Sequence, residues 1–270
     1  MYTQYYQLKE NPFSVTCDPA FFFTSPQHME AFSHLLYGIN QRKGILMVTG
    51  EIGTGKTTLC RTLLNHLDNK TKTALILNPN FSELQLLQLI IKDFGIQGHY
   101  RDKFSIITVL NEFLLAEAAK GNNVVIIIDE AQNLKVNLLE QIRLLSNLET
   151  EKAKLLQIIL VGQPELLEKL KLPTLRQLNQ RVAVRYHILP FNRADLQSYV
   201  NHRLKIAREV DHSQHQILFT KQALDALFQY SQGTPRRVNI LCDRALLAGF
   251  VEETFVIHEQ IIHKVAQEVI

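Results

Sequence analysis

The feature that most constrains this 270-residue chain is a glycine-rich run at residues 50–57. The run fits the spacing G-x-x-x-x-G-K-[ST], and it stands between an apolar run at 45–49 and a helical pattern at 57–67. In a strand–loop–helix of this kind, backbone N–H groups and the helix amino terminus surround phosphate oxygens. We therefore expect a nucleotide phosphate site formed by Gly50, Glu51, Ile52, Gly53, Thr54, Gly55, Lys56, Thr57 and Thr58.

Two side chains of this loop have distinct expected roles. The ammonium of Lys56 is expected to reach the β- and γ-phosphates of the nucleotide, and the hydroxyl of Thr57 is expected to ligate Mg²⁺. A chance glycine-rich turn is the alternative, which the flanking strand and helix patterns disfavour.

A second motif is an apolar strand that ends in two carboxylates, Asp129 and Glu130. A strand as continuously apolar as residues 124–128 is typical of a parallel sheet that is buried on both faces. Ligand sites of such folds lie at the carboxyl ends of the strands, so Asp129 is expected to hold Mg²⁺ and Glu130 to polarise the attacking water. The alternative, a buried strand capped by solvated acids, is weakened by the phosphate loop.

Composition excludes few classes of protein. The chain is 46% hydrophobic and 20% charged, with a formal net charge of +3, which is too small to argue for nucleic acid. No apolar run approaches the roughly 20 residues of a membrane span. A cytoplasmic location is the simplest interpretation.

The periodicity along the chain predicts strands that alternate with helices, and therefore a parallel sheet with helices on both faces. Five strands are expected, at 45–49, 73–77, 124–128, 155–161 and 181–189. After Pro190 only helices are expected, at 195–208, 220–232, 235–249 and 258–270. We expect an amino-terminal arm and first helix that belong to the core (1–43), an α/β core (44–190) and a small all-helical lid (191–270).

A full strand with its helices lies between the phosphate loop and Asp129. Small-molecule kinases with this loop place the two motifs on adjacent strands, so the extra strand and the glutamate beside Asp129 favour a motor-type ATPase. These residues resemble the AAA+ superfamily. The resemblance implies a water-orienting "sensor 1" at Gln163, an arginine finger in the stretch 175–181 and a "sensor 2" arginine at Arg236.

The arginine-finger region holds two candidates, Arg176 and Arg181. We assign the finger to Arg181, acting on the site of a neighbouring subunit, and the choice between the two stays open at this point. For each arginine, including Arg236, the alternative is an ordinary solvated surface residue.

The resemblance is closer to the ATPases of the general secretion pathway protein A family, and it covers essentially the whole chain. Several segments carry it, namely Tyr5–Ser14, Phe21–Phe23, His28–Phe32, Leu35–Gly38, Thr49–Gly53, Asp129–Gln132 and Val161–Leu166. The family implies that Pro12 and Phe13 pack near the adenine. The alternative is that Pro12 and Phe13 belong to a hydrophobic amino-terminal arm that packs on the core and does not contact the nucleotide.

The family further implies hydrolysis of Mg²⁺-ATP that drives assembly of a bacterial secretion or pilus machine. It implies a nucleotide-dependent homo-oligomeric ring, an inner-membrane partner protein and peripheral association with the inner membrane. Secretion members continue into a membrane span and a periplasmic peptidoglycan-binding domain. This sequence ends at Ile270 before either, so we expect a short relative or the cytoplasmic part of a longer membrane protein. Membrane tethering and wall binding are therefore not carried over.

Two other functions share the same residues. A DNA-associated helper ATPase of the transposition or replication-loader type is disfavoured, because the lid helices leave no room for a winged-helix domain and no dense Lys/Arg run occurs. A nucleotide-gated assembly switch would bind ATP and hydrolyse it negligibly without a partner. Glu130 argues against an inactive site but not against dependence on a partner. Adenine over guanine rests on the resemblance, since no Asn-Lys-x-Asp motif appears.

Overall fold

The computed structural model describes residues 1–16, 18–77, 79–151, 153–208 and 216–269. The chain divides into two compact units. The α/β unit comprises Met29–Ile52 and Leu59–Ile188, and the helical unit comprises Met1–His28, Gly53–Thr58 and Leu189–Ile270. The phosphate loop is thus shared between the two units along the chain.

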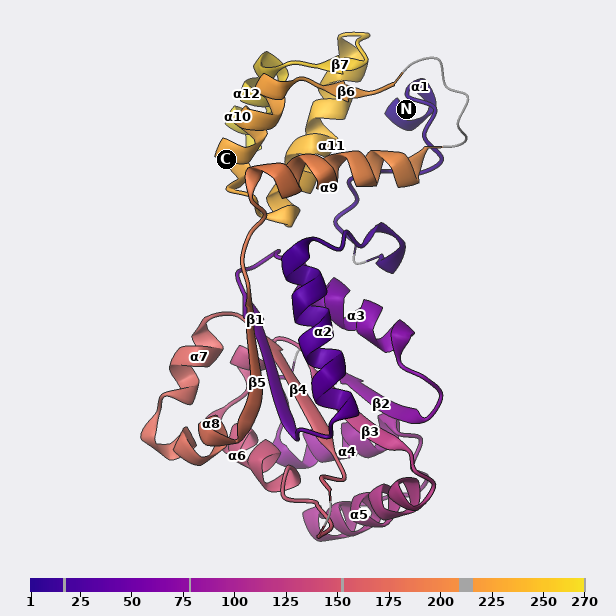
Figure 1. The fold of residues 1–270 in the computed structure, drawn as a ribbon, viewed down its shortest axis with the longest axis vertical. Coiled ribbons are helices and arrows are strands. Elements are labelled where there is room, and N and C mark those ends of the chain that lie inside the picture. The colour runs from indigo at the N-terminus through magenta and orange to yellow at the C-terminus, as the bar shows by residue number, and fades with distance from the viewer. Residues whose placement is uncertain (17, 78, 152, 209–215, 270) are drawn as a thin grey trace. The chain divides into compact units, whose positions relative to one another are not determined.

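A five-stranded parallel sheet forms the centre of the α/β unit (Figure 1), as the sequence predicts. The strand order is β2-β3-β4-β1-β5. The strands are β1 (Ile45–Gly50), β2 (Thr71–Ile76), β3 (Asn123–Ile128), β4 (Gln157–Gly162) and β5 (Val182–Ile188). In register, Thr49 of β1 pairs with Gly162 of β4 and Leu160 of β4 pairs with Ile128 of β3, so three carboxyl ends meet at one edge.

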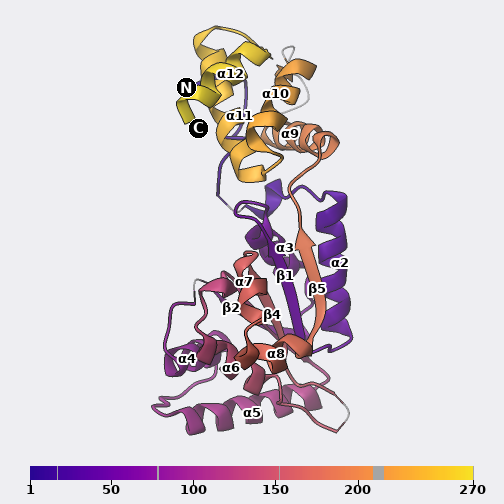
Figure 2. The ribbon, with the colours of Figure 1, turned by 90° about the vertical axis from the view of Figure 1, so that its left-hand side faces the viewer.

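Helices cover both faces of this sheet (Figures 1 and 2). The crossover from β1 to β2 runs across the sheet in the direction opposite to the later crossovers, so right-handed connections place its helix on the opposite face. The helices are α2 (Pro26–Asn40), α3 (Lys56–His66), α4 (Glu83–Asp93), α5 (Lys103–Ala119), α6 (Val136–Leu145), α7 (Glu165–Leu170) and α8 (Arg176–Arg181). Short 3-10 helices are η2 (Ala131–Asn133) and η3 (Pro173–Leu175).

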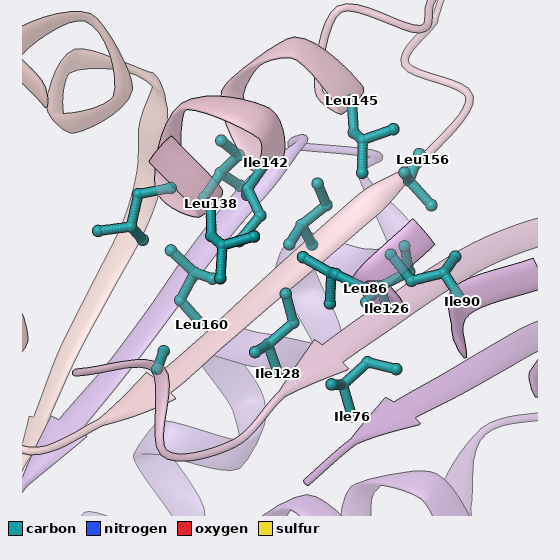
Figure 3. Close-up of a cluster of buried hydrophobic side chains, with 14 of the residues drawn as sticks. Ile76, Leu86, Ile90, Ile126, Ile128, Leu138, Ile142, Leu145, Leu156 and Leu160 are labelled. Atoms are coloured by element: carbon teal, nitrogen blue, oxygen red, sulfur yellow. The ribbon is translucent and has the colours of Figure 1, made fainter. Parts of the chain in front are cut away.

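The main hydrophobic core lies between the sheet and helices α4 to α8 (Figure 3). Ile126 and Ile128 of β3 and Leu160 of β4 meet Leu86 and Ile90 of α4 there. All residues of β1 and β4 are buried, whereas exposure alternates along β2 and β5. This pattern follows from the order of the sheet, since only β2 and β5 are edge strands.

Helix starts follow side-chain caps. The spacing of Ser82 and Gln85, a serine followed three residues later by a glutamine, predicts a capping box, and Ser82 caps α4 in this way. The next helical pattern in the sequence runs from Ser105 to Lys120, and the prediction that a helix begins at Ser105 is wrong by two residues. Asp102 caps α5 instead, with Oδ1 accepting the Ser105 backbone N–H at 2.9 Å, so the helix begins at Lys103.

The helical unit contains the four expected helices, α9 (Arg193–Ala207), α10 (Lys221–Ser231), α11 (Pro235–Val251) and α12 (Glu259–Val269). The expectation that strands stop after Pro190 is wrong. Two-residue strands β6 (Leu218–Phe219) and β7 (Val256–Ile257) pair in parallel. Strands this short hold one or two alternating side chains, too few to give a periodic signal.

The amino-terminal segment up to His28 packs in the helical unit, whereas residues 29–43 lie in the α/β unit. The expected assignment of residues 1–43 to the α/β core therefore differs only for its first part. The amino-terminal segment carries α1 (Tyr2–Tyr5) and η1 (Pro19–Phe21). Tyr6, Phe13 and Phe21 are buried in one hydrophobic cluster with side chains of α9 to α12. The buried guanidinium of Arg203 donates to the carbonyls of Pro12 and Ser14, at 2.5 and 3.0 Å. The buried aromatic side chains and the hydrogen bonds of Arg203 explain why the amino-terminal segment belongs to the helical unit.

In the part of the chain that the structure describes, no helix combines the length and the apolar character that crossing a bilayer requires.

Candidate functional site

The glycine-rich loop leaves the carboxyl end of β1 and enters α3 at Lys56. Two of its glycines have positive φ, 81° at Gly53 and 93° at Gly55, a conformation that other residues adopt with strain. The Lys56 side chain is buried, and its residue is 6% exposed. The strand–loop–helix context that the motif needs is therefore present.

The first turn of α11 lies directly on this loop. The backbone N–H of Arg236 donates to the carbonyl of Gly53 at 3.2 Å. A Cβ atom on Gly53 would lie 2.6 Å from Cβ of Arg236, so only glycine allows this approach. The guanidinium of Arg236 is exposed and bonds to none of the described residues. The proposed sensor arginine thus sits beside the phosphate loop.

His28 is a loop-supporting residue that sequence reasoning missed. Its Nε2 lies 2.8 Å from the carbonyl of Thr54, and its Nδ1 lies 2.7 Å from Oγ of Ser25. A carbonyl can only accept, so Nε2 carries the proton and Nδ1 accepts from the serine hydroxyl. The sequence signal that could have indicated this role is the position of His28 three residues after Ser25, which caps the helix. A side chain at that position can contact the capping residue.

Burial lowers the pKa of His28, whose residue is 3% exposed. Burial likewise lowers the pKa of His202. An unfolded imidazole titrates near about 6.5, so below that pH the unfolded chain binds more protons than the folded chain. The free energy of unfolding should therefore fall as pH falls through this value. The free energy of unfolding should stop falling once the pH is below the pKa of the histidine in the folded protein.

We expect His28→Gln to flatten this dependence. The variant should lose less thermal stability than the wild type between about pH 7 and pH 5, above the range in which most carboxylates titrate. Thermal unfolding followed by circular dichroism measures the difference, with the exposed His34→Gln as the matched control. A His28→Gln curve parallel to the wild type would show that the buried imidazole is not the source.

The two carboxylates follow β3 as the sequence predicts. Asp129 is buried, and its Oδ1 accepts the backbone N–H of Glu130 at 2.9 Å. Glu130 has a left-handed backbone, with φ 52° and ψ 38°. A non-glycine residue held in this region is strained, and such strain concentrates at functional sites.

Amide groups of two glutamines hold the Glu130 carboxylate. Nε2 of Gln163, directly after β4, donates to Oε2 at 3.2 Å. Nε2 of Gln132 donates to the same oxygen at 2.5 Å. The structure therefore brings together Glu130 and Gln163, two residues assigned to water activation, and adds Gln132. The only sequence signal for Gln132 was its position at the end of the Asp129–Gln132 motif.

The two candidate finger arginines lie at opposite ends of α8. Arg181 ends the helix, one residue before β5, and its Nη1 donates to Asn147 and, at 3.3 Å, to Ser146. Arg176 begins the helix and is exposed, and its guanidinium bonds to none of the described residues. Both are exposed.

Pro12 and Phe13 are both buried in the helical unit. The Phe13 residue is 1% exposed, and its ring packs edge-on to Phe219 with centroids 6.5 Å apart. The arm is therefore clamped by the helical unit rather than by the α/β core. The adenine contact stays a prediction.

The chemistry of the donor set fits Mg²⁺. Asp129 offers carboxylate oxygen at the carboxyl end of a central strand, and Thr57 offers a hydroxyl in the first turn of α3. Magnesium prefers oxygen donors, supplied by one or two protein side chains together with substrate phosphates. Among the described residues no group of three or more His, Cys, Asp or Glu forms a metal cluster.

Comparison with known proteins agrees with the fold. The AAA domain family matches residues 39–170. Two solved structures share the fold at low identity. Cdc6p from Pyrobaculum aerophilum has TM-score 0.68 at 16% identity, covering 93% of this chain and 70% of its own. Drosophila ORC bound to DNA has TM-score 0.66 at 18% identity, covering 97% of this chain and 63% of its own.

The fold, the loop and the strand-end carboxylates together are those of an AAA+ P-loop protein. The chain is a homologue of general secretion pathway protein A. It is 45% identical to that protein from Aeromonas hydrophila over 251 residues, which is 93% of this chain. The chain spans 45% of the length of that relative.

Proposed function

We propose that the protein hydrolyses ATP with water as the nucleophile. The observation that carries the proposal is the Glu130 carboxylate, held by two glutamine amides directly after the buried Asp129. Its place at the edge where β1 delivers the phosphate loop supports the assignment. A binding-only switch has no need of a positioned base.

Each residue has a separate task in this reaction. Lys56 and the loop amides bind the phosphates, Glu130 accepts a proton from the attacking water, and Gln163 orients that water. Thr57 and Asp129 would hold Mg²⁺, and the bound ion would neutralise negative charge on the phosphates. The choice of ATP over GTP rests on the family resemblance.

Arg236 is proposed to report nucleotide state to the helical unit. Support comes from the contact of its own backbone N–H with Gly53, which links α11 to the loop that would change with nucleotide. The output is then motion of the helical unit driven by the presence or loss of the γ-phosphate.

We propose further that subunits assemble into a ring in which an arginine of one subunit completes the site of the next. The 45% identity to a protein named general secretion pathway protein A supports a role in secretion. From the family resemblance we propose assembly of an envelope secretion or pilus machine, with an inner-membrane protein as partner. The DNA bound by Drosophila ORC belongs to a protein only 18% identical, which carries no argument for nucleic acid here.

ATP turnover per protomer, measured across a wide range of protein concentration, tests the proposal. We expect a rate that climbs with concentration and then saturates, because subunit contacts complete the sites. Sizing of the protein at both ends of the range identifies the oligomer. Absence of turnover at every concentration would contradict autonomous hydrolysis, and a flat rate from a monomer would contradict completion in trans.

A further inference from the structure

One side chain, Gln132, ties together two segments of the α/β unit that lie on neighbouring strands. Its Nε2 donates to Oε2 of Glu130 at 2.5 Å. Its Oε1 accepts the backbone N–H of Gln163 at 3.0 Å. The same primary amide therefore holds the carboxylate after β3 and the backbone after β4.

The two glutamine amides leave the Glu130 carboxylate with one open side. Gln132 and Gln163 both donate to Oε2, and within the described residues no donor bonds to Oε1. The plane of the carboxylate is therefore fixed while Oε1 stays available as an acceptor. A general base needs this combination, a fixed direction and a free lone pair.

Gln132 is itself held at its backbone and enclosed at its tip. Nζ of Lys169, on α7, donates to the carbonyls of Gln132 at 2.5 Å and Leu134 at 2.9 Å. A Cβ atom on Gly162 would lie 2.9 Å from Oε1 of Gln132, although φ of Gly162 is not positive. The Gln132 amide is thus the nearest of three crowding neighbours of Gly162, ahead of Leu166 Cδ2 at 3.1 Å and the Gln132 backbone nitrogen at 3.3 Å, and no positive φ demands glycine here.

We propose that Gln132 is a positioning residue that fixes the direction of the Glu130 carboxylate for water activation. The inference rests on the proposed ATP hydrolysis. Only a side chain with a donor and an acceptor on one terminal group can meet both partners, and a primary amide of this length does so. Gln132 acts through Glu130 and does not touch the reacting atoms.

Gln132→Ala removes one of the two hydrogen bonds that orient the Glu130 carboxylate, which can then rotate. We expect kcat to fall about 10- to 100-fold, because misplacing a catalytic group by about 1 Å costs on the order of 10² in rate. The affinity for ATP, measured by equilibrium binding of a fluorescent ATP analogue, should stay within about twofold, since the phosphate loop is untouched. The matched control is Gln141→Ala, which removes a buried glutamine whose Nε2 has no partner.

Gly162→Ala offers an independent route to the same amide. The added methyl should displace the Gln132 tip and lower kcat about tenfold on its own. In the Gln132→Ala background the tip is gone, so the same methyl should lower kcat further by less than about twofold. Equal effects of Gly162→Ala in both backgrounds would overturn the coupling.

Gln132→Glu separates positioning from simple stabilisation. The variant keeps the size of the side chain but places a second carboxylate against that of Glu130. Two carboxylates in contact retain a proton to higher pH. The ascending limb of the pH dependence of kcat should therefore move to higher pH, which loss of stability alone would not cause.

The outcomes distinguish this inference from the function on which it rests. If the wild type hydrolyses ATP and Gln132→Ala keeps its kcat, the inference is wrong and the proposed function stands. If Gln132→Ala and Gln141→Ala lower kcat equally, in proportion to lost stability, the role is structural and the inference is again wrong. If the wild type has no turnover, the proposed function itself fails.

Discussion

Glu130→Gln should bind ATP as the wild type does and turn it over about 10²- to 10⁴-fold more slowly. The amide oxygen can still accept from Gln132 and Gln163, so the variant keeps the hydrogen bonds seen at Oε2. It cannot take a proton from water at neutral pH, because a primary amide is not a base. The loss therefore falls on the chemical step and leaves the binding step intact.

Single-turnover hydrolysis, together with equilibrium binding of ATP, separates these two steps for Glu130→Gln. A matched carboxylate-to-amide control is Glu168→Gln, whose exposed side chain pairs only with Lys171 among the described residues. We expect the control to retain wild-type binding and turnover. Near-normal turnover in Glu130→Gln would remove the assignment of the general base and return the site to a nucleotide-gated switch.

Much of the α/β unit could be predicted because its signals are local or periodic. The apolar run 124–128 predicts a strand buried on both faces, and β3 occupies 123–128. Ser82 with Gln85 predicts a capped helix start, which the hydrogen bonds confirm. The phosphate loop and Asp129 are set by their positions after strands, so their local structure could be predicted together with the strands themselves.

The missed features depend on contacts between residues far apart in sequence. Gln132 gains its role only because β3 and β4 are neighbours, which brings Gln163 within hydrogen-bond distance. His28 meets Thr54 across 26 residues. The amino-terminal aromatic residues look equally suited to either unit by composition, and the buried Arg203, which holds them to α9, carries no periodic signal.

Arg181→Ala should lower ATP turnover about 10³- to 10⁵-fold at protein concentrations that saturate assembly, the range typical of arginine fingers. We infer Arg181 rather than Arg176 for this task from the contacts of its guanidinium. Asn147 and Ser146 fix its guanidinium through Nη1, and none of the described residues bonds to Nη2 or Nε. A guanidinium that is already held by hydrogen bonds loses less conformational entropy when it binds phosphate. The guanidinium of Arg176 has no such hydrogen bonds to the described residues.

Mixing two inactive variants decides where Arg181 acts. A Glu130→Gln subunit has an intact Arg181, and an Arg181→Ala subunit has an intact Glu130. In a ring with an arginine acting in trans, the first variant completes the site of the second, so the mixture should hydrolyse ATP faster than either alone. Arg176→Ala and the exposed Lys171→Ala serve as controls and should each stay within about threefold of wild type. No gain on mixing would mean that Arg181 acts within its own subunit. A large loss in Arg176→Ala with normal turnover in Arg181→Ala would move the finger to the other end of α8.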